Sequence, residues 1–326
     1  MNRLRWLILL LGPLPIVGSS WALSAWFKSE PPALVMRNSL LPGQLGEWSP
    51  GVPQPSSAQP VIDSLEIECL RSSDRLERTL GHECQVLVRA PFVLAGDFDQ
   101  QELADLYENT IAPAVRALRH SYFDAEPIAP VTVLVFRGEQ SYNRYCERLF
   151  DERGISIYGY YKPKLRTLVL NLGTGQGTLL HELTHALVDF DFPEIPDWFN
   201  EGLASLHEQS RFRGDDNGPS IEGLVNWRLK GLQEVARAGQ LGSLARLLEN
   251  PYFRGQSEGT NYAQARYFCL YMQQRGVLED FYRTFRQRHA NDPRGLQTLA
   301  DVFPGVSIDE IDRNFQRWVL ELPPAR

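Results

Sequence analysis

The spacing of hydrophobic and polar residues predicts a mixture of strands and helices over the first half of the chain. Strands are predicted by aliphatic and β-branched runs near 65–70, 84–95, 130–136, 157–161 and 165–171. The last two runs flank Lys162-Pro163-Lys164, which predicts a hairpin. Apolar residues at helical spacing predict an amphipathic helix from about Gln100 to Tyr122 and another from about Glu139 to Phe150.

After the strand at 166–171 the pattern becomes almost wholly helical. Gly173 to Gly177 breaks that strand, and an apolar-periodic helix follows from Thr178. Further helices are predicted at roughly 222–238, 243–249, 262–275, 278–289, 294–302 and 308–320. Strands first and helices afterwards predict an α+β fold: a small mixed β-sheet with an edge strand beside the Thr178 helix, then a mostly helical C-terminal part.

The first residues have the pattern of an export signal. Two arginines precede an apolar run from Trp6 to Val17, and Ser20-Trp21-Ala22 fits a small-x-small cleavage site. We therefore expect a signal peptide over residues 1–22 and an exported protein, periplasmic or secreted. An uncleaved segment over residues 6–27, which would tether the protein to the membrane, is the alternative.

Composition and charge indicate how the rest of the chain is organised and which partners are not expected. Residues 23–60 are rich in Pro and Ser and predict a linker or arm, followed by an N-terminal α+β segment over 61–129. The 326 residues can bury a substantial core. The net charge of −7, without a basic stripe, argues against a nucleic-acid partner.

Cysteine positions are consistent with export. Cys69 and Cys84 flank a short polar segment between two predicted strands, so a hairpin would bring them together as a disulfide in an oxidising compartment. Cys146 and Cys269 fall on separate predicted helices, and the sequence leaves open whether they pair.

The sequence His181-Glu182-Leu183-Thr184-His185 carries the chemistry of a metal site. A helix stacks residues at i and i+4 on one face, so both imidazoles can reach one Zn²⁺ ion. Glu182 follows the first histidine, where its carboxylate can act as a general base on a zinc-activated water. The alternative is a solvated helix that carries these three residues by chance.

A catalytic zinc usually has three protein ligands, and Glu201 is the best candidate for the third. Pro193 and Pro196 should end the first helix, and Asp197 should cap a second helix that carries Glu201 back beside it. Three rival carboxylates are weaker candidates, because they lie on the first helix or in its exit loop: Asp189, Asp191 and Glu194.

These motifs resemble those of gluzincin metallopeptidases, specifically the peptidase MA-like branch. HELTH followed by WFNEGLAS carries the resemblance, and HELTHALVDF is similar to the active-site helix of thermolysin. The resemblance implies a zincin-like peptidase domain over 130–326, with His181, His185 and Glu201 as ligands of one Zn²⁺ and Glu182 as base. Ser205 stands where thermolysin has an aspartate that orients a histidine, and the amine-binding motif of zinc aminopeptidases is absent.

A second similarity lies at Asn261-Tyr262-Ala263-Gln264-Ala265, which resembles a helix of the same branch. It implies that the Tyr262 hydroxyl stabilises an oxyanion; the alternative is a tyrosine that only packs between helices. His207 and His289 are expected to be ordinary surface or half-buried histidines.

Together these features predict an exported zinc metallopeptidase that hydrolyses a peptide or protein substrate. The strand at 166–171 is expected to pair with an extended substrate. The competing hypothesis is an exported, non-catalytic zinc-binding or scaffolding protein that keeps the peptidase fold. The intact Glu182 favours the enzyme.

Overall fold

The computed structural model describes residues 64–154, 156–215, 218–250, 253–255 and 257–323. They all belong to one compact unit of the chain. The expected signal peptide (1–22), the arm (23–60) and the alternative tether (6–27) lie outside the described residues. Among the helices that are described, none has the length and apolar character needed to cross a membrane.

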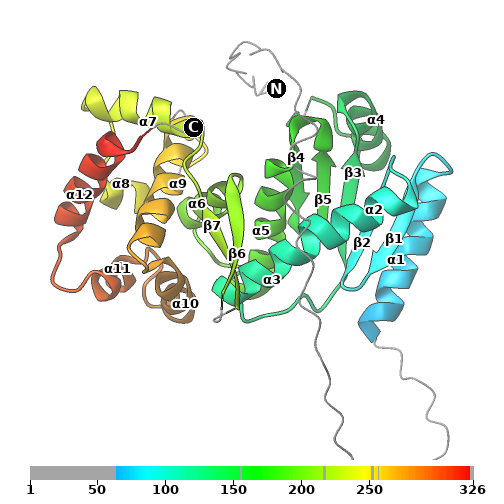
Figure 1. Cartoon of the computed structure of the whole chain (residues 1–326), viewed down its shortest axis with the longest axis horizontal. Coiled ribbons are helices and arrows are strands. Elements are labelled where there is room, and N and C mark those ends of the chain that lie inside the picture. Colours follow the sequence, from blue (N-terminus) through cyan, green and yellow to red (C-terminus); the bar gives the residue numbers. More distant parts are fainter. Residues whose placement is uncertain (1–63, 155, 216–217, 251–252, 256, 324–326) are drawn as a thin grey trace, which may run out of the picture. The chain divides into compact units, whose positions relative to one another are not determined.

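The N-terminal half forms a five-stranded mixed sheet with helices on both faces (Figure 1). Its elements in chain order are α1 (Ser64–Leu80), β1 (Gln85–Arg89), β2 (Phe92–Gly96), α2 (Gln100–Leu106), a π-helical turn (Tyr107–Ile111), α3 (Ala112–Ser121), β3 (Val131–Phe136), α4 (Glu139–Phe150), β4 (Gly159–Lys162) and β5 (Thr167–Asn171). The strand order is β1-β2-β3-β5-β4, with β2, β3 and β5 parallel and the two outer strands antiparallel.

Successive side chains of the central strands point to opposite faces of the sheet, and each face packs against its own layer of helices. Phe92 and Leu94 pack into the core beneath α2, α3 and the later helix α5 (Gly177–Asp191), whereas Val93 and Ala95 pack into the core beneath α1 and α4. Every residue of β2, β3 and β5 is buried, which explains why these strands are continuous apolar runs in the sequence.

The strand predicted at 65–70 is wrong, and so is the expectation that the strand at 166–171 pairs with a substrate. The run at 65–70 belongs to helix α1, because apolar residues such as Leu65, Cys69 and Leu76 recur at helical spacing on its inner side. The strand at 166–171 is β5, which is hydrogen-bonded to β3 and β4 on its two sides. It therefore has no free edge for a substrate, and the edge strand next to α5 is β4.

The predicted disulfide is also wrong. Cys69, Cys84, Cys146 and Cys269 are all free and buried. Because Cys69 lies on α1 rather than in a strand of a hairpin with Cys84, the expected pairing geometry does not arise. Cys69 and Cys84 instead pack as small apolar side chains in the core under α1 and α4.

The C-terminal half is mostly helical, as the sequence predicts. Its elements are α5 (Gly177–Asp191), α6 (Asp197–His207), β6 (Ser210–Asp215), β7 (Gly218–Gly223), α7 (Arg228–Arg237), α8 (Leu244–Leu248), α9 (Glu258–Gln274), α10 (Leu278–Arg288), α11 (Leu296–Val302) and α12 (Ile308–Glu321). The β6–β7 hairpin is a difference from the prediction, which placed a helix from about residue 222.

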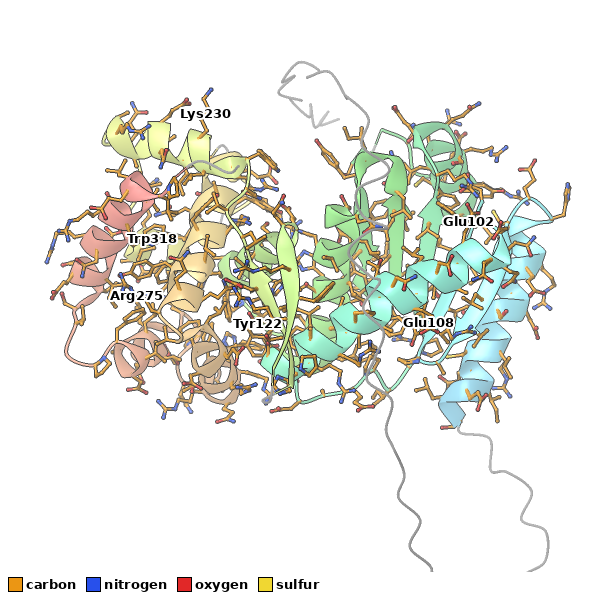
Figure 2. All side chains as sticks on the ribbon, in the orientation of Figure 1. Glu102, Glu108, Tyr122, Lys230, Arg275 and Trp318 are labelled. Carbon is orange, nitrogen blue, oxygen red and sulfur yellow. The ribbon has the colours of Figure 1, made fainter. Side chains whose placement is uncertain are left out.

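An aromatic cluster joins the sheet half to the helical half. Figure 2 shows Tyr122 at the end of α3, beside the β6–β7 hairpin. The Tyr122 ring lies 5.6 Å from the ring of His207 on α6 and 5.7 Å from that of Tyr282 on α10. Since Tyr122 is almost fully buried, these contacts belong to one continuous core.

Helices α6 and α9 pack closely because Gly202 has no side chain. A Cβ at Gly202 would lie 2.9 Å from the Ala265 carbonyl oxygen and 2.9 Å from Cys269 Sγ. Both distances are too short for a real side chain. The glycine that directly follows Glu201 therefore sets how near α9 comes to the helix that carries this residue.

We predict that Gly202→Ala destabilises the protein by about 1–3 kcal/mol, because the added methyl group overpacks the α6–α9 contact. Gly231→Ala is a matched control: it is also a helical glycine, but nothing lies within 4 Å of its Cβ position. That change should stabilise the protein by about 0.5–1 kcal/mol. Urea unfolding measures both, and equal effects would contradict the packing argument.

Candidate metal centre

Helix α5 presents the two histidines on one side. Leu179, Leu183 and Ala186 are fully buried and anchor the opposite side in the core. His181 and His185 lie one turn apart with their rings edge to face, 4.7 Å between centroids. The helical spacing therefore brings both imidazoles to one point, as the sequence predicts.

A tight turn carries the chain from α5 into α6. The turn spans residues 192–196, and Pro196, rather than Asp197, is the N-cap of α6; Asp197 is the first helical residue. Trp198 and Phe199 are buried in the core and fix the start of this helix. Glu201, one turn later, then faces α5 with its side chain only 2 % exposed.

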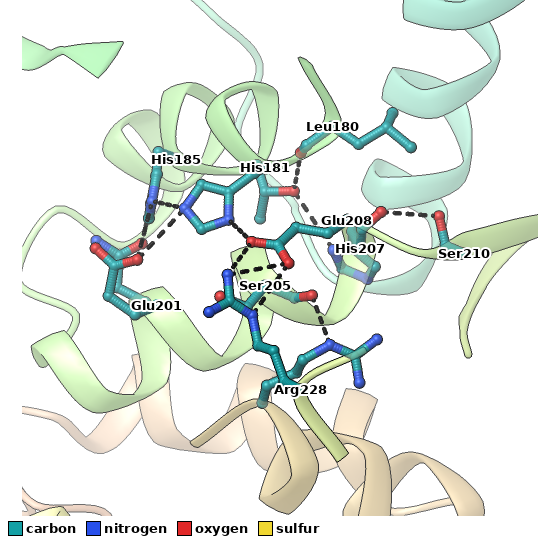
Figure 3. Close-up of polar contacts among 12 residues, drawn as sticks. Leu180, His181, His185, Glu201, Ser205, His207, Glu208, Ser210 and Arg228 are labelled. Carbon is teal, nitrogen blue, oxygen red and sulfur yellow. Dashed lines mark hydrogen bonds and ion pairs between the residues drawn. The ribbon is translucent and has the colours of Figure 1, made fainter. Parts of the chain in front are cut away.

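The three side chains converge on one point (Figure 3). His181 Nε2 lies 3.0 Å from His185 Nε2, and Glu201 Oε2 lies 3.4 Å and 3.6 Å from these two nitrogens. Ligands about 2.0–2.1 Å from a tetrahedral metal ion are about 3.3 Å from one another. Within the described part of the chain, no other group of three or more His, Cys, Asp or Glu side chains is arranged to hold one ion.

The chemistry of these donors fits a cation. Glu201 Oε2 is buried and accepts no hydrogen bond from any described residue, although it points at two imidazole nitrogens. Burial alone would lower the pKa of His181, but Glu201 and Glu208 outweigh burial and raise that pKa to about 10. The carboxylates therefore favour positive charge at the point where the three side chains meet, so the group could hold a metal ion.

A second set of contacts orients the two imidazoles. His185 Nδ1 lies 2.8 Å from Asn200 Oδ1, and His181 Nδ1 lies 3.1 Å from Glu208 Oε1. With Nε2 facing the ion, each Nδ1 carries the proton. His185 Nδ1 donates it to Asn200 Oδ1, whereas His181 Nδ1 and Glu208 Oε1 form a close ion-pair contact without hydrogen-bond geometry. Oxygen partners of this kind fix the ring orientation of metal-binding histidines.

Glu208 is a site residue that the sequence analysis missed. Arg228 pairs with it at 2.9 Å, and although burial would raise the Glu208 pKa, His181 and Arg228 lower it to about 2. The Ser205 hydroxyl has no partner among the described residues. Glu208 lies three positions after Ser205, directly after the end of α6, and its side chain contacts His181. No local spacing indicates Glu208, because its partners His181 and Arg228 are brought to it by the fold.

Glu182 and Tyr262 also belong to this region. Glu182 is buried, has no hydrogen-bond partner in the described structure, and its negative charge contributes to the raised pKa of His181. Tyr262, on α9, is half-buried against Phe253, with ring centroids 5.2 Å apart. Burial and then the Glu201 carboxylate raise the pKa of the Tyr262 phenol, so its hydroxyl keeps its proton.

The rival carboxylates are engaged elsewhere or exposed. Asp189 accepts a hydrogen bond from the Tyr161 hydroxyl at 3.0 Å. Asp191 is buried and pairs with Arg286 at 2.5 Å. Glu194 is exposed in the turn after α5. Of the four candidate carboxylates, only Glu201 is brought to both histidines.

His207 differs from its expected place near the surface. It is fully buried, and its Nδ1 lies 3.4 Å from the Thr184 hydroxyl. Burial, followed by the positive charges of Arg266 and His181, lowers the His207 pKa to about 3. His289 is half-buried, as expected, with its ring against Phe192 and Phe285.

Comparison with known proteins adds no relative to these observations. No protein-family model matches the chain, and no curated protein matches its sequence.

We predict that Glu208→Gln weakens Zn²⁺ binding by about 10–100-fold, because the neutral amide no longer favours the orientation of His181. Competition with a chromophoric chelator measures the affinity. Glu222→Gln is the control, since Glu222 pairs only with the surface arginines Arg211 and Arg213 among described residues. Equal Zn²⁺ affinity of the Glu208→Gln and wild-type proteins would contradict the orienting role.

Acid should destabilise the protein through His207. Its folded-state pKa of about 3 is below the unfolded value of about 6.5, so the unfolded chain takes up the proton first and stability falls as pH drops below 6.5. This group alone should remove about 2 kcal/mol between pH 7 and pH 5. In urea unfolding at the two pH values, His207→Phe should lose less stability than wild type; parallel losses would refute the assignment.

Proposed function

We propose that this protein is an exported, zinc-dependent metallopeptidase of the gluzincin type that hydrolyses peptide bonds. The observation that carries the proposal is the convergence of His181 Nε2, His185 Nε2 and Glu201 Oε2, with the unpartnered carboxylate of Glu182 next to the first ligand. Two imidazoles and one carboxylate are a ligand set of catalytic zinc sites, in which the fourth position stays open. When bound, zinc would polarise a substrate carbonyl and lower the pKa of water.

Glu182 is proposed to move the protons. Its carboxylate accepts no hydrogen bond among the described residues, so both oxygens remain available to take a proton from the attacking water. After the carbon–nitrogen bond breaks, the same carboxyl group returns that proton to the leaving amine. One side chain thus acts first as base and then as acid.

Tyr262 is proposed to stabilise the oxyanion. Burial and the nearby Glu201 carboxylate raise the pKa of its phenol, so the hydroxyl keeps its proton. This O–H can then donate a hydrogen bond to negative charge that develops on the substrate carbonyl oxygen. The packing of its ring against Phe253 limits the rotation of the side chain.

The edge strand β4 is proposed to hold the substrate backbone. No described strand pairs with its outer side, and the Tyr161 hydroxyl ties β4 to Asp189 on α5, the helix with the metal-site histidines. An extended peptide can add to such an edge through main-chain hydrogen bonds. In this mode the strand would bind the peptide backbone rather than a particular side-chain sequence.

We predict that Glu182→Gln keeps Zn²⁺ but lowers kcat by roughly 10²–10⁴-fold or more, because proton transfer is lost while the ligands stay in place. Zinc-loaded wild type and variant are compared on a peptide library, with bound metal measured for each. His185→Ala should lose the metal itself. Undiminished turnover by Glu182→Gln would contradict the mechanism, and a zinc-loaded wild type that cleaves no peptide would favour the non-catalytic zinc-binding protein.

A further inference from the structure

The two oxygens of Glu201 have different surroundings. Oε2 faces the imidazoles of His181 and His185, at 3.4 Å and 3.6 Å. Oε1 is paired with Arg254, whose Nη2 lies 2.5 Å away. One oxygen of the carboxylate therefore faces the candidate metal position, and the other faces the arginine.

The two partners also differ in burial. The Glu201 side chain is 2 % exposed, whereas the Arg254 side chain is 58 % exposed. An exposed ion pair normally contributes little, because water and entropy offset its attraction. Here one partner is a buried carboxylate, so the guanidinium supplies hydrogen bonding that solvent cannot supply to Oε1.

The backbone that carries Arg254 is held in place. The preceding residue, Phe253, is buried and packs against the Tyr262 ring. The carbonyl oxygen of Phe253 accepts a hydrogen bond from the Asn261 side chain at 2.7 Å. Two contacts to α9 thus fix the segment, and the guanidinium reaches Glu201 from an anchored position.

We infer that Arg254 is a positioning residue for the metal centre, which occupies Oε1 of Glu201 and leaves only Oε2 to bind the ion. The inference rests on the metal-binding part of the proposed function and not on peptide hydrolysis. Without the arginine, the Glu201 side chain can rotate and offer both oxygens. The sequence motif that contains Glu201 gives no sign of this partner, which lies more than fifty positions further along the chain.

The test compares Zn²⁺ affinity in full-length proteins stripped of metal. Arg254→Met removes all donors and should weaken binding by about 10–100-fold, the usual cost of losing a partner of a metal ligand. Arg254→Gln keeps a neutral N–H donor and should recover part of the affinity. Arg294→Met is the matched control, because Arg294 is 57 % exposed and pairs with Glu249 at the same 2.5 Å, but Glu249 is 45 % exposed. Arg294→Met should bind Zn²⁺ like wild type.

Co²⁺ provides a readout of geometry that a merely structural role would not change. If Oε1 becomes free in Arg254→Met, it can join the ion, raise the coordination number and weaken the visible absorption bands of Co²⁺. Zn²⁺ affinity equal to or tighter than wild type, or an unchanged Co²⁺ spectrum, would overturn the inference. Tight Zn²⁺ binding by a wild type that cleaves no peptide would instead reject the peptidase function and leave the role of Arg254 standing.

Discussion

Burial of the Glu201 carboxylate is the constraint on which the rest of the centre depends. A charge removed from water is costly unless it is paired and hydrogen-bonded. His181 and His185 face one of its oxygens, and Arg254 pairs with the other. These partners come from α5 and from the segment before α9. The contacts that stabilise the Glu201 charge therefore hold α5, α6 and that segment together.

The close contact between α6 and α9 extends this arrangement. Gly202 lets α9 approach, and α9 supplies Arg266, which is fully buried and donates from Nε to the Ser205 carbonyl oxygen at 2.9 Å near the end of α6. Burial lowers the Arg266 pKa to about 10, yet the guanidinium remains charged at neutral pH. The helix that carries Glu201 is therefore held along its length, by its glycine in the middle and by a cation at its C-terminal end.

The sequence predicts those parts of the molecule that depend on local spacing. The histidine pair, the helix carrying Glu201, the strand at 131–136 and the helix at 139–150 all follow from periodicity within one element. The sequence predictions fail where tertiary contacts determine the secondary structure. The short run at 65–70 fits a strand or a helix equally well, and the pairing of β6 with β7 depends on how these polar segments pack against α3. Glu208 and Arg254 were missed for the same reason, since their importance lies in partners brought to them by the fold.

The turn over residues 192–196 has a consequence for the order in which the centre can form. All three candidate ligands lie within residues 181–201, so closing the loop between them costs little chain entropy, and such local contacts form quickly. Arg228 and Arg254 join from later in the chain, at a larger entropic cost. The α5–α6 pair can therefore assemble the ligand cluster as a local folding unit, and docking of the C-terminal helices then completes its surroundings.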